Sequence, residues 1–258
     1  DQFRSVTYTT ATGFLPVGYT GAPATVNDIS SGGVAAATTA NVFNTGTAQS
    51  VLSGGQTINS LSLRDSANNV TFLGSATDTL TVSSGNIISL RTGGAYNFGT
   101  TANRGAVTSG QSELFWYASG MTINVNSVIK DNGSGAVKLV YGGSGANMVL
   151  TAPNTFTGGT VVSGTTMTLT ATAGAGTLVI PNAADPATGV VINNATLNST
   201  LAGQIGSANI VTLNGGATLS LTGANTLSGL VFNSTGGTSN PTVSGGTSLL
   251  IAGDIVST

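Results

Sequence analysis

Apolar residues recur at every second position over short stretches of this chain, with threonine, serine and asparagine between them. The clearest stretches of this kind cover residues 56–65, 78–91, 121–130 and 217–223. A period of two is typical of a β-strand with one buried and one exposed face. No window sustains the i, i+3, i+4, i+7 spacing together with helix formers and caps. The pattern therefore predicts an all-β protein built from short strands.

Glycine pairs punctuate these strands. They begin at positions 32, 54, 93, 142, 158, 215, 236 and 245, and several of the gaps are near multiples of about 20 residues, the coil length of short-repeat solenoids. Other gaps are not, so the repeat is imperfect. In addition, residues 59–89 resemble residues 228–257 in their order of apolar strands and polar turns. We expect a β-solenoid with imperfect coils of about 20 residues.

The composition suits such a stack. Valine, isoleucine and leucine pack well on a pleated surface that faces inward, while glycine and asparagine supply the tight corners. Asparagine and threonine side chains can form hydrogen bonds with the coils on either side. Coils of this length would give about 13 rungs and a rod about 60 Å long.

Segment 127–171 carries a more specific pattern. The turn and strand positions that carry this pattern are Asp131, Gly133, Gly135, Asn154, Thr155, Phe156, Gly158 and Gly159. The segment resembles the passenger-associated repeat of bacterial autotransporter-type proteins. It differs at Phe156, where that repeat commonly has tyrosine, and at Tyr141-Gly142 and Pro153. The resemblance implies a secreted passenger folded as a right-handed parallel β-helix, and it implies no catalytic residue.

Two regions depart from the alternating pattern. Residues 1–50 include a stretch rich in proline, glycine and aromatic residues, so we expect an irregular cap or interaction segment there, continuous with a solenoid over 51–258. In this segment Phe14 and Tyr19 could contact a partner or plug the solenoid end. Bulky residues also run consecutively through Phe115, Trp116 and Tyr117. These three aromatic residues are candidates for a contact surface, with core packing as the alternative.

Charge and chemistry restrict the function. Only 5% of the 258 residues are charged, with six Lys and Arg, eight Asp and Glu, and neither histidine nor cysteine. Six basic residues are too few to form the basic surface that nucleic acid requires. Without histidine there is no imidazole for a catalytic triad or a metal site, and without cysteine there is no thiol chemistry. The aspartates at 65, 78, 131, 185 and 254 each stand alone at predicted turns. We therefore expect no enzyme, no cofactor and no metal.

The sequence also bears on location and partners. No run of about 20 apolar residues could form a transmembrane helix, and the first residues show no signal peptide, so we expect a processed or partial chain. The leading hypothesis is a non-catalytic protein of the bacterial surface or extracellular space, acting as stalk, adhesin or matrix component toward a host or matrix ligand. An alternative is a filament subunit that associates end to end through open strand edges. A remote alternative is an enzyme that acts on polysaccharide.

Overall fold

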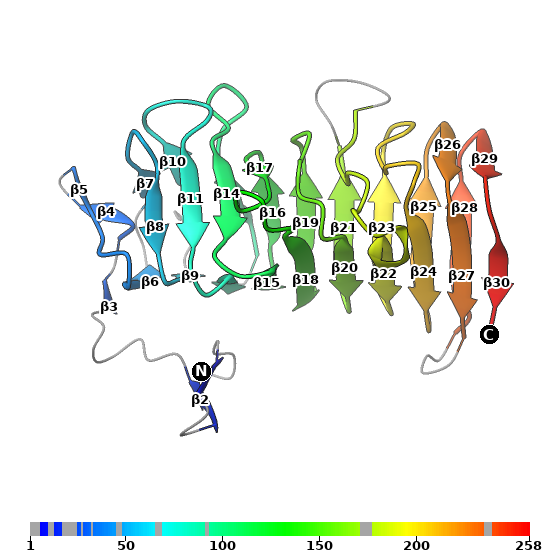
Figure 1. The fold of residues 1–258 in the computed structure, drawn as a ribbon, viewed down its shortest axis with the longest axis horizontal. Coiled ribbons are helices and arrows are strands. Elements are labelled where there is room, and N and C mark those ends of the chain that lie inside the picture. Colours follow the sequence, from blue (N-terminus) through cyan, green and yellow to red (C-terminus); the bar gives the residue numbers. More distant parts are fainter. Residues whose placement is uncertain are drawn as a thin grey trace.

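The computed structural model describes residues 6–9, 13–16, 25–26, 28–31, 33–44, 48–64, 69–90, 93–170, 177–234 and 239–258. Within them the chain forms a parallel β-solenoid, in which each coil adds one rung to stacked sheets (Figure 1). This confirms the fold class predicted from the alternating pattern.

The longest sheet, called sheet I below, has eleven strands, and each lies parallel to its neighbours. Because a strand pairs with the equivalent strand of the next coil, the order in space follows the order in the chain. The strands are β3 (Thr25–Val26), β6 (Asn41–Asn44), β9 (Ser60–Leu63), β12 (Asn86–Leu90), β15 (Glu113–Ser119), β18 (Lys138–Ser144), β20 (Thr160–Ser163), β22 (Val190–Asn193), β24 (Ile210–Asn214), β27 (Gly229–Asn233) and β30 (Ile255–Ser257).

A second sheet of nine strands, called sheet II, also runs along the stack. Its outer face carries mainly threonine, serine and asparagine. In spatial order its strands are β7 (Gln49–Val51), β10 (Val70–Phe72), β13 (Ala95–Phe98), β16 (Thr122–Val125), β19 (Asn147–Leu150), β21 (Thr166–Leu169), β23 (Thr196–Ser199), β25 (Thr218–Leu221) and β28 (Thr242–Gly245).

The third face is not one continuous sheet, because its strands form two separate sheets, one in the first part of the stack and one in the last. Four strands form its first part, namely β8 (Gln56–Ile58), β11 (Thr79–Val82), β14 (Ala106–Ser109) and β17 (Val128–Ile129), and two form its last part, β26 (Ala224–Leu227) and β29 (Ser248–Ile251). Between them the described parts of 151–159, 177–189 and 200–209 hold only the bridge Ile180–Ile205 and a 3-10 turn at Pro186–Thr188. In this middle part, side-chain hydrogen bonds add to the isolated backbone bonds that join the coils.

The coils vary in length. Partners in sheet I are 16 residues apart at Thr25 and Asn41, and 30 apart at Val162 and Ile192. The strands stay short, and the connections between them differ in length. Residues 170–189 link β21 to β22, whereas only residues 200–209 link β23 to β24. Longer coils explain why sheet I has eleven rungs rather than the expected 13.

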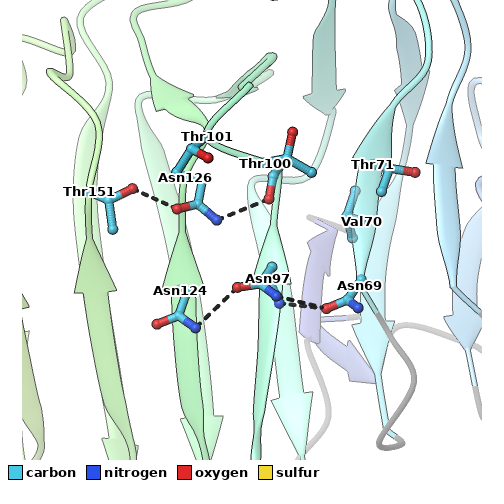
Figure 2. A pocket seen from close by; sticks show the side chains of 10 residues that line it. Asn69, Val70, Thr71, Asn97, Thr100, Thr101, Asn124, Asn126 and Thr151 are labelled. Atoms are coloured by element: carbon cyan, nitrogen blue, oxygen red, sulfur yellow. Dashed lines mark hydrogen bonds between the residues drawn. The ribbon is translucent and has the colours of Figure 1, made fainter. Parts of the chain in front are cut away.

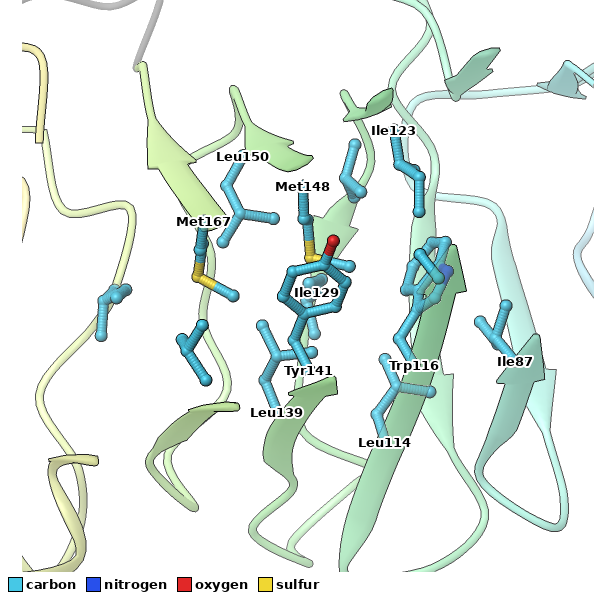
Figure 3. Close-up of a cluster of buried hydrophobic side chains, with 14 of the residues drawn as sticks. Ile87, Leu114, Trp116, Ile123, Ile129, Leu139, Tyr141, Met148, Leu150 and Met167 are labelled. Carbon is cyan, nitrogen blue, oxygen red and sulfur yellow. The ribbon is translucent and has the colours of Figure 1, made fainter. Parts of the chain in front are cut away.

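The core is a column of inward-facing apolar side chains along the whole stack. Strands such as β16 and β19 alternate buried and partly exposed residues, as the period of two requires. The largest side chains gather near the centre, where Trp116 and Tyr141 lie on adjacent rungs among leucine, isoleucine and methionine (Figure 3). Trp116 Nε1 donates to Ser89 Oγ at 3.0 Å, and the same oxygen meets the hydroxyl of Tyr96.

Among the described residues of the first 50, two antiparallel hairpins occur. They are β1 (Val6–Thr9) with β2 (Gly13–Pro16), and β4 (Ser30–Ser31) with β5 (Val34–Ala35). Strands β3 and β6 of sheet I also lie in this segment, so the stack extends into the region where we expected a cap. Next to the second hairpin, buried Ile29 donates its N–H to Gln49 Oε1 at 2.8 Å and accepts from Gln56 Nε2 at 3.0 Å.

Candidate functional site

Asp131 joins two coils through its carboxylate. Oδ1 accepts the backbone N–H of Val137 at 2.8 Å and that of Thr157 at 2.9 Å, and Oδ2 accepts the Thr157 hydroxyl at 2.7 Å. Val137 belongs to the same turn as Asp131, whereas Thr157 comes from the following coil. The carboxylate is therefore occupied in holding the turn against its neighbour.

Asn154 bridges three successive coils from a buried position. Its Oδ1 accepts the N–H of Ile129 at 2.8 Å, and its Nδ2 donates to the carbonyl of Val179 at 2.7 Å. The side chain lies in the middle part of the third face, where no strand ladder is present among the described residues. Farther along, the side chain of Asn209 binds the preceding coil, where its Oδ1 accepts from Ala183 N–H at 2.9 Å and its Nδ2 donates to the carbonyl of Pro181 at 2.9 Å. These amides therefore strengthen the contact between coils that share few backbone hydrogen bonds on this face.

The rest of the repeat-like motif has packing roles. Phe156 is fully buried in the core, and the N–H of Thr155 donates to Ile129 O at 2.9 Å. Gly159 has φ +91°, and a Cβ there would meet the backbone of Thr188. Gly158 is equally enclosed, by the backbone of 137–138.

Two further glycines of the motif lie in the turn that follows Asp131. Gly133 has φ +61°, with open space where a Cβ would be. Gly135 exchanges backbone hydrogen bonds with Asn132, N–H to carbonyl, at 3.0 and 3.1 Å. The turn is exposed, and the positive φ of Gly133 is a backbone conformation that favours glycine.

The aromatic cluster divides between the two faces of β15. Trp116 is fully buried, so it packs in the core rather than on a contact surface. Phe115, at 39% exposure, and the half-buried Tyr117 point outward from the same strand. In the N-terminal segment, Phe14 lies in β2 with its backbone opposite Tyr8, and Tyr19 lies outside the described residues.

A groove of about 400 Å³ lies on the outer face of sheet II, over β10, β13 and β16 (Figure 2). Uncharged residues line it, from these strands, from the turn after β13 and from positions next to strand ends, including Thr151 directly after β19. They are Asn69, Val70, Thr71, Asn97, Gly99, Thr100, Thr101, Asn124, Asn126 and Thr151. Sequence reasoning missed this groove, because no local motif marks it.

An amide ladder runs along one side of the groove. Asn69 Oδ1 accepts the backbone N–H of Asn97 at 2.8 Å, and Asn124 Nδ2 donates to Asn97 Oδ1 at 3.1 Å. The floor is fixed by Asn126, whose Nδ2 donates to Gly99 O at 3.0 Å and whose Oδ1 accepts the Thr151 hydroxyl at 2.7 Å. The groove is therefore polar, neutral and held in shape by its own hydrogen bonds.

Other acidic residues of the described chain also serve turns. Asp78 accepts N–H groups of Gly54 at 3.0 Å and Ser75 at 2.7 Å, and Asp185 accepts that of Ala187 at 3.0 Å. Asp65 lies outside the described residues. In the parts of the chain that the structure describes, no three acidic side chains gather where they could hold a metal ion. Those same parts contain no helix long and apolar enough to cross a membrane.

The rung formed by β28, β29 and β30 exposes apolar side chains. Leu250 is 61% exposed, Ile255 64% and Val256 41%. Leu249 and Ile251 lie beside them and are only partly buried against the core. This rung is therefore far more apolar toward solvent than the outer faces of the stack.

No family model, no curated protein and no solved structure matches this chain. The resemblance of 127–171 to the autotransporter repeat therefore stays a prediction from the sequence.

Proposed function

We propose that this chain is a non-catalytic structural protein of the bacterial surface or extracellular space, in which the solenoid acts as a stalk, adhesin or matrix component. The observation that supports this best is the unbroken stack of eleven parallel rungs around one apolar column. Such a stack is rigid along its axis and spans about 50 Å at about 4.8 Å per rung. It presents long lateral faces on which contacts can be placed.

The hydrogen bonds of the motif residues agree with a structural role. Asp131 and Asn154 are two of the polar side chains that segment 127–171 places between coils, and each forms hydrogen bonds with backbone groups of its neighbours. The backbone pairing of each strand joins it only to the adjacent rungs, so stability accumulates from one coil to the next. A stalk or adhesin needs a long, stable rod of this kind to hold a contact surface away from its anchor, and it needs no reactive group.

Antibody labelling tests the location. Antibodies raised against the purified chain should label intact, non-permeabilised cells of the producing bacterium or recover the chain from the medium. Labelling that appears only after permeabilisation would contradict the proposal. The adhesin version is tested separately, by binding of the fluorescent chain to host cells and to immobilised matrix. It fails if the chain binds no better than an inert β-rich protein of similar size.

A second candidate function is end-to-end assembly into filaments, favoured by the apolar rung of β28, β29 and β30. Exposed strand edges pair readily with other strands. Sedimentation should then show polymers that grow with concentration and are lost in Ile255→Lys. The control Leu73→Lys changes a side chain that is 60% exposed but lies outside this rung, and it should leave polymers intact. A wild-type chain that stays monomeric at every concentration refutes this candidate.

A further inference from the structure

We propose that the groove on sheet II binds a neutral oligosaccharide, with the sugar chain lying across β10, β13 and β16. This goes beyond the structural role proposed above, because it assigns a ligand class to one place on the lateral face. The groove has the volume of an ordinary small-ligand site. Its chemistry decides which ligand fits.

The lining of the groove selects against charged ligands. None of its ten residues is ionisable. The guanidinium of Arg104 lies nearby, but its Nη1 donates to the carbonyls of Asn126 at 3.0 Å and Thr151 at 3.3 Å. Within the groove itself, a phosphate or carboxylate ligand would meet only neutral amides, hydroxyls and backbone groups. Single-stranded nucleic acid would further need aromatic platforms, which the lining lacks.

The same lining offers hydrogen bonds of both kinds. In the ladder, Asn69 uses Oδ1 and Asn124 uses Nδ2. The opposite atoms, Asn69 Nδ2 and Asn124 Oδ1, have no hydrogen-bond partner among the described residues. The groove thus presents a donor at one end and an acceptor at the other, with the exposed hydroxyl of Thr101 on its wall. Sugar hydroxyls both donate and accept, so they complement this arrangement.

The geometry favours an extended ligand. Ladder residues repeat at the rung spacing of about 4.8 Å, which is comparable with the length of one sugar residue in a chain. The floor residue Asn126 is 7% exposed and has both polar atoms engaged, so the site is formed before a ligand binds. A peptide strand is a poorer occupant, because β10, β13 and β16 already pair with neighbouring strands on both edges.

The test uses the full chain labelled with ¹⁵N and followed by nuclear magnetic resonance of its asparagine side-chain amides. The probes are three neutral hexasaccharides (cellohexaose, maltohexaose and xylohexaose) and the anionic hexagalacturonate. We expect at least one neutral probe to shift the amide signals of Asn69, Asn97 and Asn124 saturably at millimolar concentration, and hexagalacturonate not to do so. No saturable shift with any neutral probe, or a shift with hexagalacturonate alone, overturns the proposal.

Asn124→Val supplies the matched variant. Val149 occupies the same column on the next rung, so sheet II accommodates valine at such a position. Loss of the Asn124 amide should weaken binding about five- to tenfold, the value of one net hydrogen bond. Asn198→Val changes an asparagine of the same column outside the groove. It should leave affinity unchanged, and equal losses in the two variants would place the binding elsewhere.

Discussion

Replacing Asn154 by alanine should destabilise the stack strongly, although this side chain is small and lies far from either end. The change removes both hydrogen bonds of the amide, to Ile129 N–H and to Val179 O. Asn154 is only 4% exposed, and Ile129 and Val179 are fully buried. Water can therefore not readily replace the lost partner. The variant leaves one donor and one acceptor in the interior unsatisfied.

The magnitude follows from those two groups. A buried polar group without a partner costs about 1–3 kcal/mol, so the two groups together should lower the free energy of unfolding by about 2–6 kcal/mol. Urea unfolding measures the total. Hydrogen exchange localises it, because the amide of Ile129 should exchange faster while amides several coils away, such as that of Leu219, keep their protection.

Asn198→Ala is the control for this substitution. Asn198 lies on the outer face of sheet II, is partly exposed, and makes no side-chain hydrogen bond within the described residues. Its loss should change stability by no more than about 0.5 kcal/mol. If Asn154→Ala is no more destabilising than Asn198→Ala, and the Ile129 amide stays protected, then side-chain amides do not hold the third face together.

Three other outcomes test the packing and the buried groups. Gly159→Ala should cost more than about 3 kcal/mol or prevent folding, because its Cβ would clash with the Thr188 backbone at a positive φ, whereas Gly133→Ala should cost only about 1 kcal/mol in thermal unfolding. Trp116→Ala should lower the free energy of unfolding by about 3–5 kcal/mol, as for other large core truncations, and a loss below 1 kcal/mol would contradict its burial. Burial raises the pKa of Tyr141 to about 12, against a smaller opposing effect of Thr165. An unfolded tyrosine ionises near pH 10, so the contribution of Tyr141 to stability is complete below about pH 10 and is lost as the pH rises toward 12. Between about pH 10 and 12, the loss in free energy of unfolding should be about 2–3 kcal/mol smaller in Tyr141→Phe than in the wild-type chain. Identical pH profiles of the two proteins would refute the raised pKa of Tyr141.

Many of the strands could be predicted from the alternating pattern, because a half-buried strand requires apolar residues at every second position of the sequence. Residues 121–130 became β16 and β17, and 217–223 contain β25. Even the bulky run at 114–117 obeys the period, since Leu114 and Trp116 point inward while Phe115 and Tyr117 point outward. The sequence concealed this because its outward positions are aromatic instead of polar.

Long-range register limited what else could be predicted. The groove depends on Asn69, Asn97 and Asn124 lying on successive rungs, yet these residues are separated by 28 and 27 positions, unlike the neighbouring coils. Coil lengths are set by turns of unequal length, which no local pattern encodes. The bridging role of Asn154 likewise depends on the coils before and after it, so the motif indicated its importance but not its partners.

One distance tests the stacked rod most directly. The chain contains no cysteine, so Ser50→Cys and Ser244→Cys can carry two spin labels on the outer positions of β7 and β28, the first and last strands of sheet II. Eight strand spacings of about 4.8 Å place the two backbones about 38 Å apart. Electron-spin distance measurement should give a single narrow distribution near that value. A broad distribution, or one centred below about 25 Å, where eight such spacings cannot fit, would contradict the rigid solenoid on which the account rests.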